Sequence, residues 1–155
     1  MALFTSTESI NSFRLIKNAS LIKDVLTEFQ ESLPILKKSE EYRKTMSEKF
    51  AAYAYFLVLK YNDDNVGFCA FYANDHDKKI AYISFIAVAD KFRGQHFGKL
   101  ILEKTIEISR QQGMESLKLE VLKSNNIAQG FYLANDFKVL CDASDNSIYM
   151  IRDVR

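Results

Sequence analysis

One segment near the middle of the chain constrains the fold more than any other, because an apolar strand passes through a short basic turn directly into an amphipathic helix. The strand pattern covers residues 80–88, and the helical pattern begins after Gly94 and runs to about Gln112. Gly113 then stands where helices commonly end in a left-handed residue. A turn of this kind exposes unpaired N–H groups and the positive end of the helix dipole, so it predicts a site for phosphate or pyrophosphate.

The residues of the turn favour the same interpretation. Gly94 and Gly98 let the backbone come close to a ligand, and Arg93 and Lys99 would add charge-assisted contacts. The turn lacks the Gly-Lys-Ser/Thr ending of a P-loop, and its glycine spacing differs from that of a dinucleotide-binding fingerprint. Nucleotide hydrolysis and dinucleotide binding are therefore disfavoured. A plain strand-to-helix connection with surface charges stays open on this segment alone.

The periodicity of the apolar residues gives the other elements. They are a strand at 13–16, a helix from Ala19, a second helix at 40–51, a hairpin of strands at 55–59 and 66–72, the strand at 80–88, a strand at 117–122, a short helix from about Asn126, and a closing hairpin at 137–141 and 148–151. This order predicts one α+β domain over residues 1–155 with a mixed sheet, preceded by a loose lead-in at residues 1–12.

Composition excludes several classes of partner. The formal net charge is +1, which gives no reason to expect nucleic acid or a membrane surface. The two cysteines, Cys69 and Cys141, do not form a disulfide framework and fit a reducing, cytoplasmic compartment. No apolar run reaches the length of a membrane span or of a signal peptide. We expect no metal site.

A second pattern follows the first along the chain. It is the run Leu119-Glu120-Val121, Ser124-Asn125-Asn126-Ile127-Ala128-Gln129-Gly130-Phe131-Tyr132 and Asn135-Asp136-Phe137. This run resembles the second signature of the GNAT superfamily of N-acetyltransferases. The strand, turn and helix described above resemble the pyrophosphate-binding signature of the same superfamily, Arg/Gln-x-x-Gly-x-Gly/Ala. Each signature is degenerate, but the two in this order are specific, and the resemblance covers nearly the whole chain.

The resemblance implies a fold and a ligand. The fold would be a mostly antiparallel mixed sheet of about seven strands, with helices on both faces and a central parallel pair that splays apart. Residues 83–88 and 117–122 would form that pair, and acetyl-coenzyme A would lie in the opening. The implied cofactor-binding residues are Ile86, Ala87 and Val88 for the pantetheine and thioester, Arg93, Gly94, Gln95, His96, Phe97, Gly98 and Lys99 for the pyrophosphate, and Asn125 for the pantetheine arm.

Tyr132 is the implied catalytic residue, acting as the general acid for the departing thiolate. A phenol has a pKa near 10 and a thiol about 8.5, so a tyrosine can protonate the thiolate as it leaves. The general base stays open. Glu120 is one candidate, and a water held by Tyr82 and Ser84 is another. His76, in a turn, and His96, in the phosphate segment, are weaker candidates.

A covalent route through a cysteine is disfavoured. Cys69 lies inside an apolar run with no activating base beside it in the sequence, so a buried structural thiol is the better interpretation. Direct attack by the amine in a ternary complex is the simpler expectation.

Two residues depart from the family pattern. His96 occupies the first glycine position of the pyrophosphate signature, and its effect depends on the backbone there. If the backbone there is left-handed, His96 would weaken cofactor binding. If the backbone is simply helical, the amide of His96 still donates and its imidazole could add a contact; we expect the helical case. Asp136 replaces the glycine before the closing Phe137, where we expect a left-handed residue that aspartate tolerates.

The implied function is transfer of acetyl from acetyl-coenzyme A to a primary amine. The acceptor is open, with a small molecule favoured over a protein because the chain is compact and shows no docking segment. A non-catalytic module that senses or holds acetyl-coenzyme A is the alternative. Transfer of a longer acyl group and a homodimer also stay open.

Overall fold

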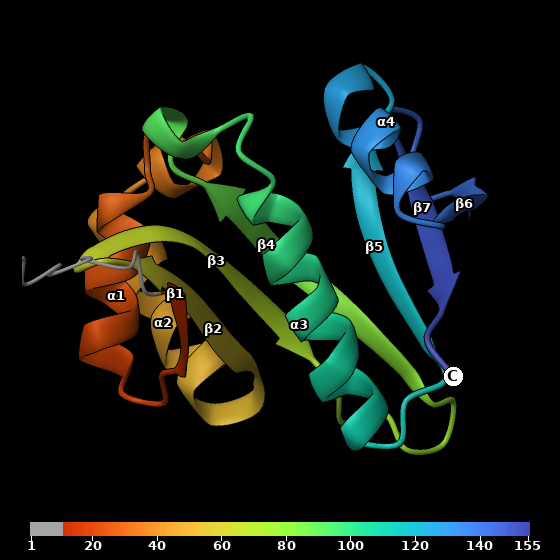
Figure 1. Ribbon diagram of the computed structural model, residues 1–155, viewed down its shortest axis with the longest axis horizontal. Coiled ribbons are helices and arrows are strands. Elements are labelled where there is room, and N and C mark those ends of the chain that lie inside the picture. Colours follow the sequence, from red (N-terminus) through yellow and green to blue (C-terminus); the bar gives the residue numbers. More distant parts are fainter. Residues whose placement is uncertain (1–10) are drawn as a thin grey trace, which may run out of the picture.

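The computed structural model describes residues 11–155, and within that range seven strands form a single sheet with four α-helices packed on it (Figure 1). The strands are β1 (Asn11–Leu15), β2 (Tyr55–Tyr61), β3 (Asp64–Tyr72), β4 (Ile80–Val88), β5 (Ser116–Leu122), β6 (Lys138–Asp142) and β7 (Ser147–Asp153). The helices are α1 (Ala19–Glu28), α2 (Glu40–Tyr53), α3 (Phe97–Gln111) and α4 (Asn126–Ala134), with short 3-10 turns at Pro34–Lys37 and Asp90–Phe92.

The spatial order of the strands is β1-β2-β3-β4-β5-β7-β6. Every neighbouring pair is antiparallel except β4 and β5, which run parallel. The chain therefore passes through three antiparallel strand pairs to β4, crosses over through α3, and enters β5 in the same direction as β4. The predicted α+β class, the mixed sheet and its parallel pair are confirmed, and the predicted strand hairpins lie where the sequence placed them.

Two apolar clusters hold the layers together, one on each face of the sheet. Alternation along β2 divides its side chains: Leu57 and Leu59 pack toward α3 and α4, while Phe56 and Val58 pack toward α1 and α2. All four are fully buried. Figure 1 shows α3 crossing one face while α1 and α2 lie against the other. The predicted helices on both faces are thus confirmed, because each face of the central strands is apolar.

The ends of the elements differ little from the expectations. Strand β1 begins at Asn11, two residues before the expected start and inside the predicted lead-in; residues 1–10 of that lead-in lie outside the described residues. Helix α3 ends in a left-handed Gly113 with φ of 82°, as predicted. Asp136, after α4, also takes a positive φ of 68°, which confirms the left-handed conformation expected at this position.

Candidate active site

Strands β4 and β5 diverge, and this divergence creates the site. They are paired only from Ile80 to Ile83 on β4, against Ser116 to Leu119 on β5. Beyond that point β4 continues to Val88 without β5 beside it. Backbone groups on that edge of β4 are left without a strand partner, which is costly unless water or a ligand satisfies them. The predicted splayed pair is therefore confirmed.

A β-bulge lies at the point of divergence. On the other side of β4, Phe71 of β3 pairs with Ile83 and Ala70 pairs with Phe85, so Ser84 is an extra residue between two regular pairs. A bulge bends its strand and increases the local twist. The bend at Ser84 directs the end of β4 away from β5, while β4 stays joined to β3 as far as Val88.

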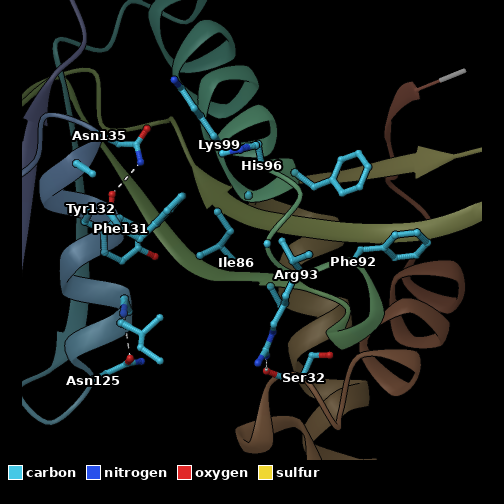
Figure 2. A pocket seen from close by; sticks show the side chains of 18 of the residues that line it. Ser32, Ile86, Phe92, Arg93, His96, Lys99, Asn125, Phe131, Tyr132 and Asn135 are labelled. Atoms are coloured by element: carbon cyan, nitrogen blue, oxygen red, sulfur yellow. Dashed lines mark hydrogen bonds between the residues drawn. The ribbon is translucent and has the colours of Figure 1, made fainter. Parts of the chain in front are cut away.

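A cleft of about 750 Å³ occupies the opening (Figure 2). One wall is the end of β4 with the following turn and the start of α3, and the other wall is α4. Eleven of the twelve predicted site residues line it: Ile86, Ala87, Val88, Arg93, Gly94, His96, Phe97, Gly98, Lys99, Asn125 and Tyr132. Gln95 does not, and its side-chain amide instead donates to the carbonyl of Lys91 at 3.4 Å.

Eight further lining residues were not among the predicted site residues. They are Ser32, Leu33, Phe92, Ile127, Ala128, Phe131, Ala134 and Asn135. Ser32 and Leu33 come from the connection after α1, far away in the sequence, so no local motif marks them. Phe131 was visible only as the neighbour of Tyr132; its ring lies 3.6 Å from the point where a Cβ on Gly98 would stand. Phe131 thus lies across the cleft from Gly98, at a distance that would also accommodate a Cβ there.

The phosphate end of the cleft is the start of α3. His96 is the N-cap residue, and its side chain makes no capping hydrogen bond. The first N–H groups of the helix consequently face the cleft without a side-chain acceptor at the cap. His96 has φ of 65° and ψ of 12°, which is the left-handed conformation. Our expectation of a helical backbone at His96 is therefore wrong: the chain must reverse between the 3-10 turn and α3, and Gly94 with φ of 78° supplies only part of that reversal.

The two cations of the predicted phosphate site differ in their surroundings. Arg93 lies 3.1 Å from a carboxylate oxygen of Asp90, and its guanidinium donates to the carbonyl of Ser32 at 3.4 Å (Figure 2). Lys99 has a weaker partner, with Nζ 4.0 Å from Glu103. Arg93 thus connects the turn to the segment after α1, whereas Lys99 remains the less constrained charge beside the N-terminus of α3.

The opposite wall is built around the N-terminus of α4. The side-chain oxygen of Asn125 accepts a hydrogen bond from the amide of Ala128 at 3.1 Å, which caps the helix. This bond occupies the oxygen of Asn125 and leaves its NH₂ group for other partners. Asn125 therefore both starts α4 and lines the cleft.

Tyr132 projects from α4 into the inner part of the cleft and is 7 % exposed. Its ring packs against Phe131 and Phe137, with ring centroids 5.3 and 5.4 Å away. Burial raises the pKa of Tyr132 well above the usual value for a tyrosine, and the nearby Cys69 raises it further. The raised pKa keeps the phenol protonated at neutral and moderately alkaline pH, which is the state that a proton donor requires.

Cys69 lies on β3 directly opposite Ile86 and is completely buried. Burial raises the pKa of its thiol to about 12, although a hydrogen bond with Thr105 lowers the pKa slightly. A thiol in this environment is neutral and a poor nucleophile. The geometry agrees with a structural thiol.

The acid and the tyrosine considered for proton removal lie on the other face of the sheet. Glu120 pairs across the strands with Tyr149, and its carboxylate accepts a hydrogen bond from Ser147 at 2.6 Å. Burial raises the pKa of Tyr82, and the proximity of Glu120 and Tyr149 raises it further. Tyr82 and Glu120 are thus close enough to interact, beside the point where β4 and β5 part. Neither lines the cleft that holds Tyr132.

Comparison with known proteins agrees with this architecture. Residues 21–137 match the model of the Acetyltransferase (GNAT) family. Since the match spans more than half of the chain, the protein belongs to the GNAT acetyltransferase family.

One curated relative matches part of the chain. It is a protein of Bacillus subtilis (strain 168) that carries the name putative ribosomal protein bS18-alanine N-acetyltransferase, and it is 32% identical over 80 residues. The matched region covers 52% of this chain and 51% of the relative, so it spans about half the length of each.

Solved structures share the fold at low sequence identity. The ribosomal-protein-S18-alanine N-acetyltransferase of Escherichia coli superposes with a TM-score of 0.76 at 19% identity, over 94% of each chain. The PaiA N-acetyltransferase of Thermoplasma acidophilum, solved in complex with coenzyme A, gives a TM-score of 0.67 at 17% identity, over 92% of this chain and 99% of that one. These likenesses establish the fold.

Within residues 11–155, no group of three histidine, cysteine, aspartate or glutamate side chains is arranged to hold a metal ion. In the same range, no helix has both the length and the apolar character needed to cross a membrane.

Proposed function

We propose that this protein is an acetyl-coenzyme A-dependent N-acetyltransferase that acts on a primary amine by direct attack in a ternary complex. The observation that carries the proposal is the cleft between the splayed strands, which has a helix N-terminus on one wall and a buried, protonated tyrosine on the other. This arrangement supports anion binding at one point of the cavity and proton donation at another.

The residues of the cleft fit coenzyme A. The first turn of α3, Gly98 and Lys99 provide N–H donors and a positive charge for the pyrophosphate. The unpaired edge of β4 at Ile86–Val88 provides main-chain groups for the amides of the pantetheine arm. Asn125 contributes its free NH₂ group from the other wall. Acetyl-coenzyme A supplies the activated acetyl group for the reaction.

The chemical step needs three contributions from the protein. A backbone N–H near Ile86 would stabilise the developing oxyanion of the thioester carbonyl, an effect typically worth about a hundredfold or more in rate. Tyr132 would donate its proton to the departing sulfur. A base must also remove a proton from the amine, and we propose Glu120, directly or through a water between Tyr82 and Ser84, because these residues lie where the two strands part.

For the acceptor, we propose a small-molecule primary amine as the first class to test. The relatives named for the alanine of a ribosomal protein favour a second class, the N-terminal amine of a peptide. Both classes present the same reacting group to the opening between β4 and β5. An amine panel should therefore contain amino sugars, polyamines, amino acids and short peptides that begin with alanine.

The experiment combines binding and turnover. Acetyl-coenzyme A is titrated calorimetrically into wild-type protein and into Tyr132→Phe, and thiol release is followed over the amine panel. We expect both proteins to bind, and the turnover of the variant to be lower by about a hundredfold or more because a proton donor is lost. Absence of binding by the wild type would refute the proposal. Binding without turnover of any amine would instead support a non-catalytic sensor.

A further inference from the structure

His96 is the residue in which the phosphate end of this cleft departs most from the family pattern. Its imidazole lines the cleft next to the N–H groups of α3, and the side chain is exposed to solvent (Figure 2). The left-handed backbone does not detach the residue from the helix, because the carbonyl of His96 accepts a hydrogen bond from the amide of Leu100 at 3.3 Å. The backbone of His96 is therefore joined to the first turn of α3, at the rim of the cleft.

The charges around His96 are few. Among the side chains that line the cleft, the ones that can titrate are Arg93, His96 and Lys99 on the same wall and Tyr132 on α4. The lining residues of β4 and of the segment after α1 carry no titratable group. Arg93 is paired with Asp90 at 3.1 Å, and Tyr132 is neutral. Lys99 and a protonated His96 are consequently the positive charges not closely paired with a carboxylate, since Glu103 approaches Lys99 only to 4.0 Å.

We propose that His96 makes the binding of coenzyme A depend on pH, with its protonated imidazole adding a positive charge to the pyrophosphate site and its neutral form removing that charge. Histidine is the side chain that ordinarily changes charge between about pH 5 and 8. The charged form attracts the pyrophosphate more strongly, so affinity is expected to rise as the pH falls across that range. This inference rests on the proposed function, because coenzyme A must bind in this cleft.

Reciprocity gives the inference a second consequence. If protonation of His96 tightens the binding of coenzyme A, bound coenzyme A must favour protonation of His96 by the same factor. The chain has a second histidine, His76, on the exposed connection between β3 and β4 outside the cleft. His76 therefore serves as an internal reference within the same molecule.

The test uses 3′-dephospho-coenzyme A, whose pyrophosphate does not titrate near neutral pH and which lacks the titrating 3′-phosphate. Its affinity is measured calorimetrically between pH 8.0 and 5.5 for wild type and for His96→Asn. Asparagine tolerates the left-handed conformation and does not titrate, so the variant keeps the backbone while losing the switch. We expect the wild type to bind roughly twofold to fivefold more tightly at the lower pH, which is the size of an exposed charge pair, and the variant to change much less.

The imidazole resonances of wild type provide an independent measurement that needs no variant. On addition of 3′-dephospho-coenzyme A, the midpoint of the His96 titration should move to higher pH while that of His76 stays in place. Equal pH dependence in wild type and His96→Asn, or an unmoved His96 midpoint, would overturn the inference and leave the proposed function intact. Failure of the wild type to bind at every pH would refute the proposed function as well.

Discussion

Strand β4 has a lower half at residues 80–83 and an upper half at residues 85–88, and the two show how one strand can serve both stability and binding. In the lower half, Ala81 and Ile83 are buried and β4 is paired on both sides, with β3 and with β5. In the upper half, Ile86 and Val88 are half-buried, and β4 is paired with β3 alone. The same apolar sequence therefore forms closed core below the bulge at Ser84 and the wall of an open cleft above it.

The difference shows where the molecule can leave backbone groups unpaired. The upper half of β4 keeps its partner β3, whose Val66, Phe68 and Cys69 are fully buried, so losing β5 does not loosen the strand from the core. The opening is confined to one edge. A ligand can then use the exposed edge while the rest of the sheet remains rigid, which is the preorganisation that catalysis requires.

The prediction with the largest expected effect concerns a matched pair of truncations, one in each half of β4. Ile83→Ala removes a side chain that is 3 % exposed and should lower the free energy of unfolding by about 3 kcal/mol, as for other large-to-small core changes. Ile86→Ala removes the same atoms from the cleft wall and should cost about 1 kcal/mol, because that side chain is only partly buried. Urea unfolding measures both values.

Binding should show the opposite order. Acetyl-coenzyme A affinity is expected to fall for Ile86→Ala, which lines the cleft, and to change little for Ile83→Ala measured well below its unfolding midpoint. Equal losses of stability in the two variants would show that the upper half is as well packed as the lower half and would break the comparison.

A second test asks whether solvent is excluded from the upper half of β4 on the side of β3. Cys69 lies behind Ile86, and burial raises the pKa of its thiol from 9.0 to about 12. Because the folded state holds the proton of Cys69 more tightly, the contribution of the protonated thiol to the free energy of unfolding is complete below about pH 9. That contribution is lost as the pH rises from 9 toward 12. Between pH 7.5 and 10.5 the wild type should lose about 2 kcal/mol more of its unfolding free energy than Cys69→Ala.

This comparison is made by urea unfolding of both proteins at the two pH values. The variant corrects for the tyrosines and lysines that also titrate in this range, since it retains them all. An identical loss in the two proteins would mean that solvent reaches the thiol through the cleft.

The sequence was informative wherever one residue type satisfies a local requirement. Gly113 after α3 and Asp136 after α4 take the positive φ angles that their chemistry permits. The second signature placed Asn125 at the start of α4 and Tyr132 within it, because that pattern is short and local. The sequence could not reveal that Arg93 contacts Ser32, since that contact joins residues 61 positions apart and depends on tertiary packing.

The error at His96 has a similar physical cause. A helical backbone was expected at His96 because Gly94 and Gly98 remain in the segment, but the left-handed residues are Gly94 and His96, while Gly98 lies within α3. The position of the reversal depends on how the 3-10 turn at Asp90–Phe92 directs the chain into α3. Histidine, like asparagine and aspartate, is enriched among the few non-glycine residues with positive φ, but most histidines have a negative φ, so the residue type alone did not indicate this conformation.

The smallest test compares these two left-handed residues by stability. A Cβ placed on Gly94 would meet nothing within 4 Å, so Gly94→Ala changes the backbone preference without a steric clash. It should lower the free energy of unfolding by about 1 kcal/mol. His96→Gly should raise it by about 0.5 kcal/mol, because relief of the left-handed strain exceeds the entropy that glycine adds to the unfolded chain.

Changes of opposite sign in the free energy of unfolding for these two substitutions would show that the turn before α3 keeps a strained histidine at a measurable cost in stability. Thermal unfolding at pH 8.0, where the charge on the imidazole contributes least, isolates the backbone effect. A loss of stability in His96→Gly would instead mean that the imidazole stabilises the folded turn by more than its backbone strains it. The presence of a side chain where the family signature has glycine would then be explained by folding. The pH dependence of coenzyme A binding would have to be measured against that contribution with His96→Asn.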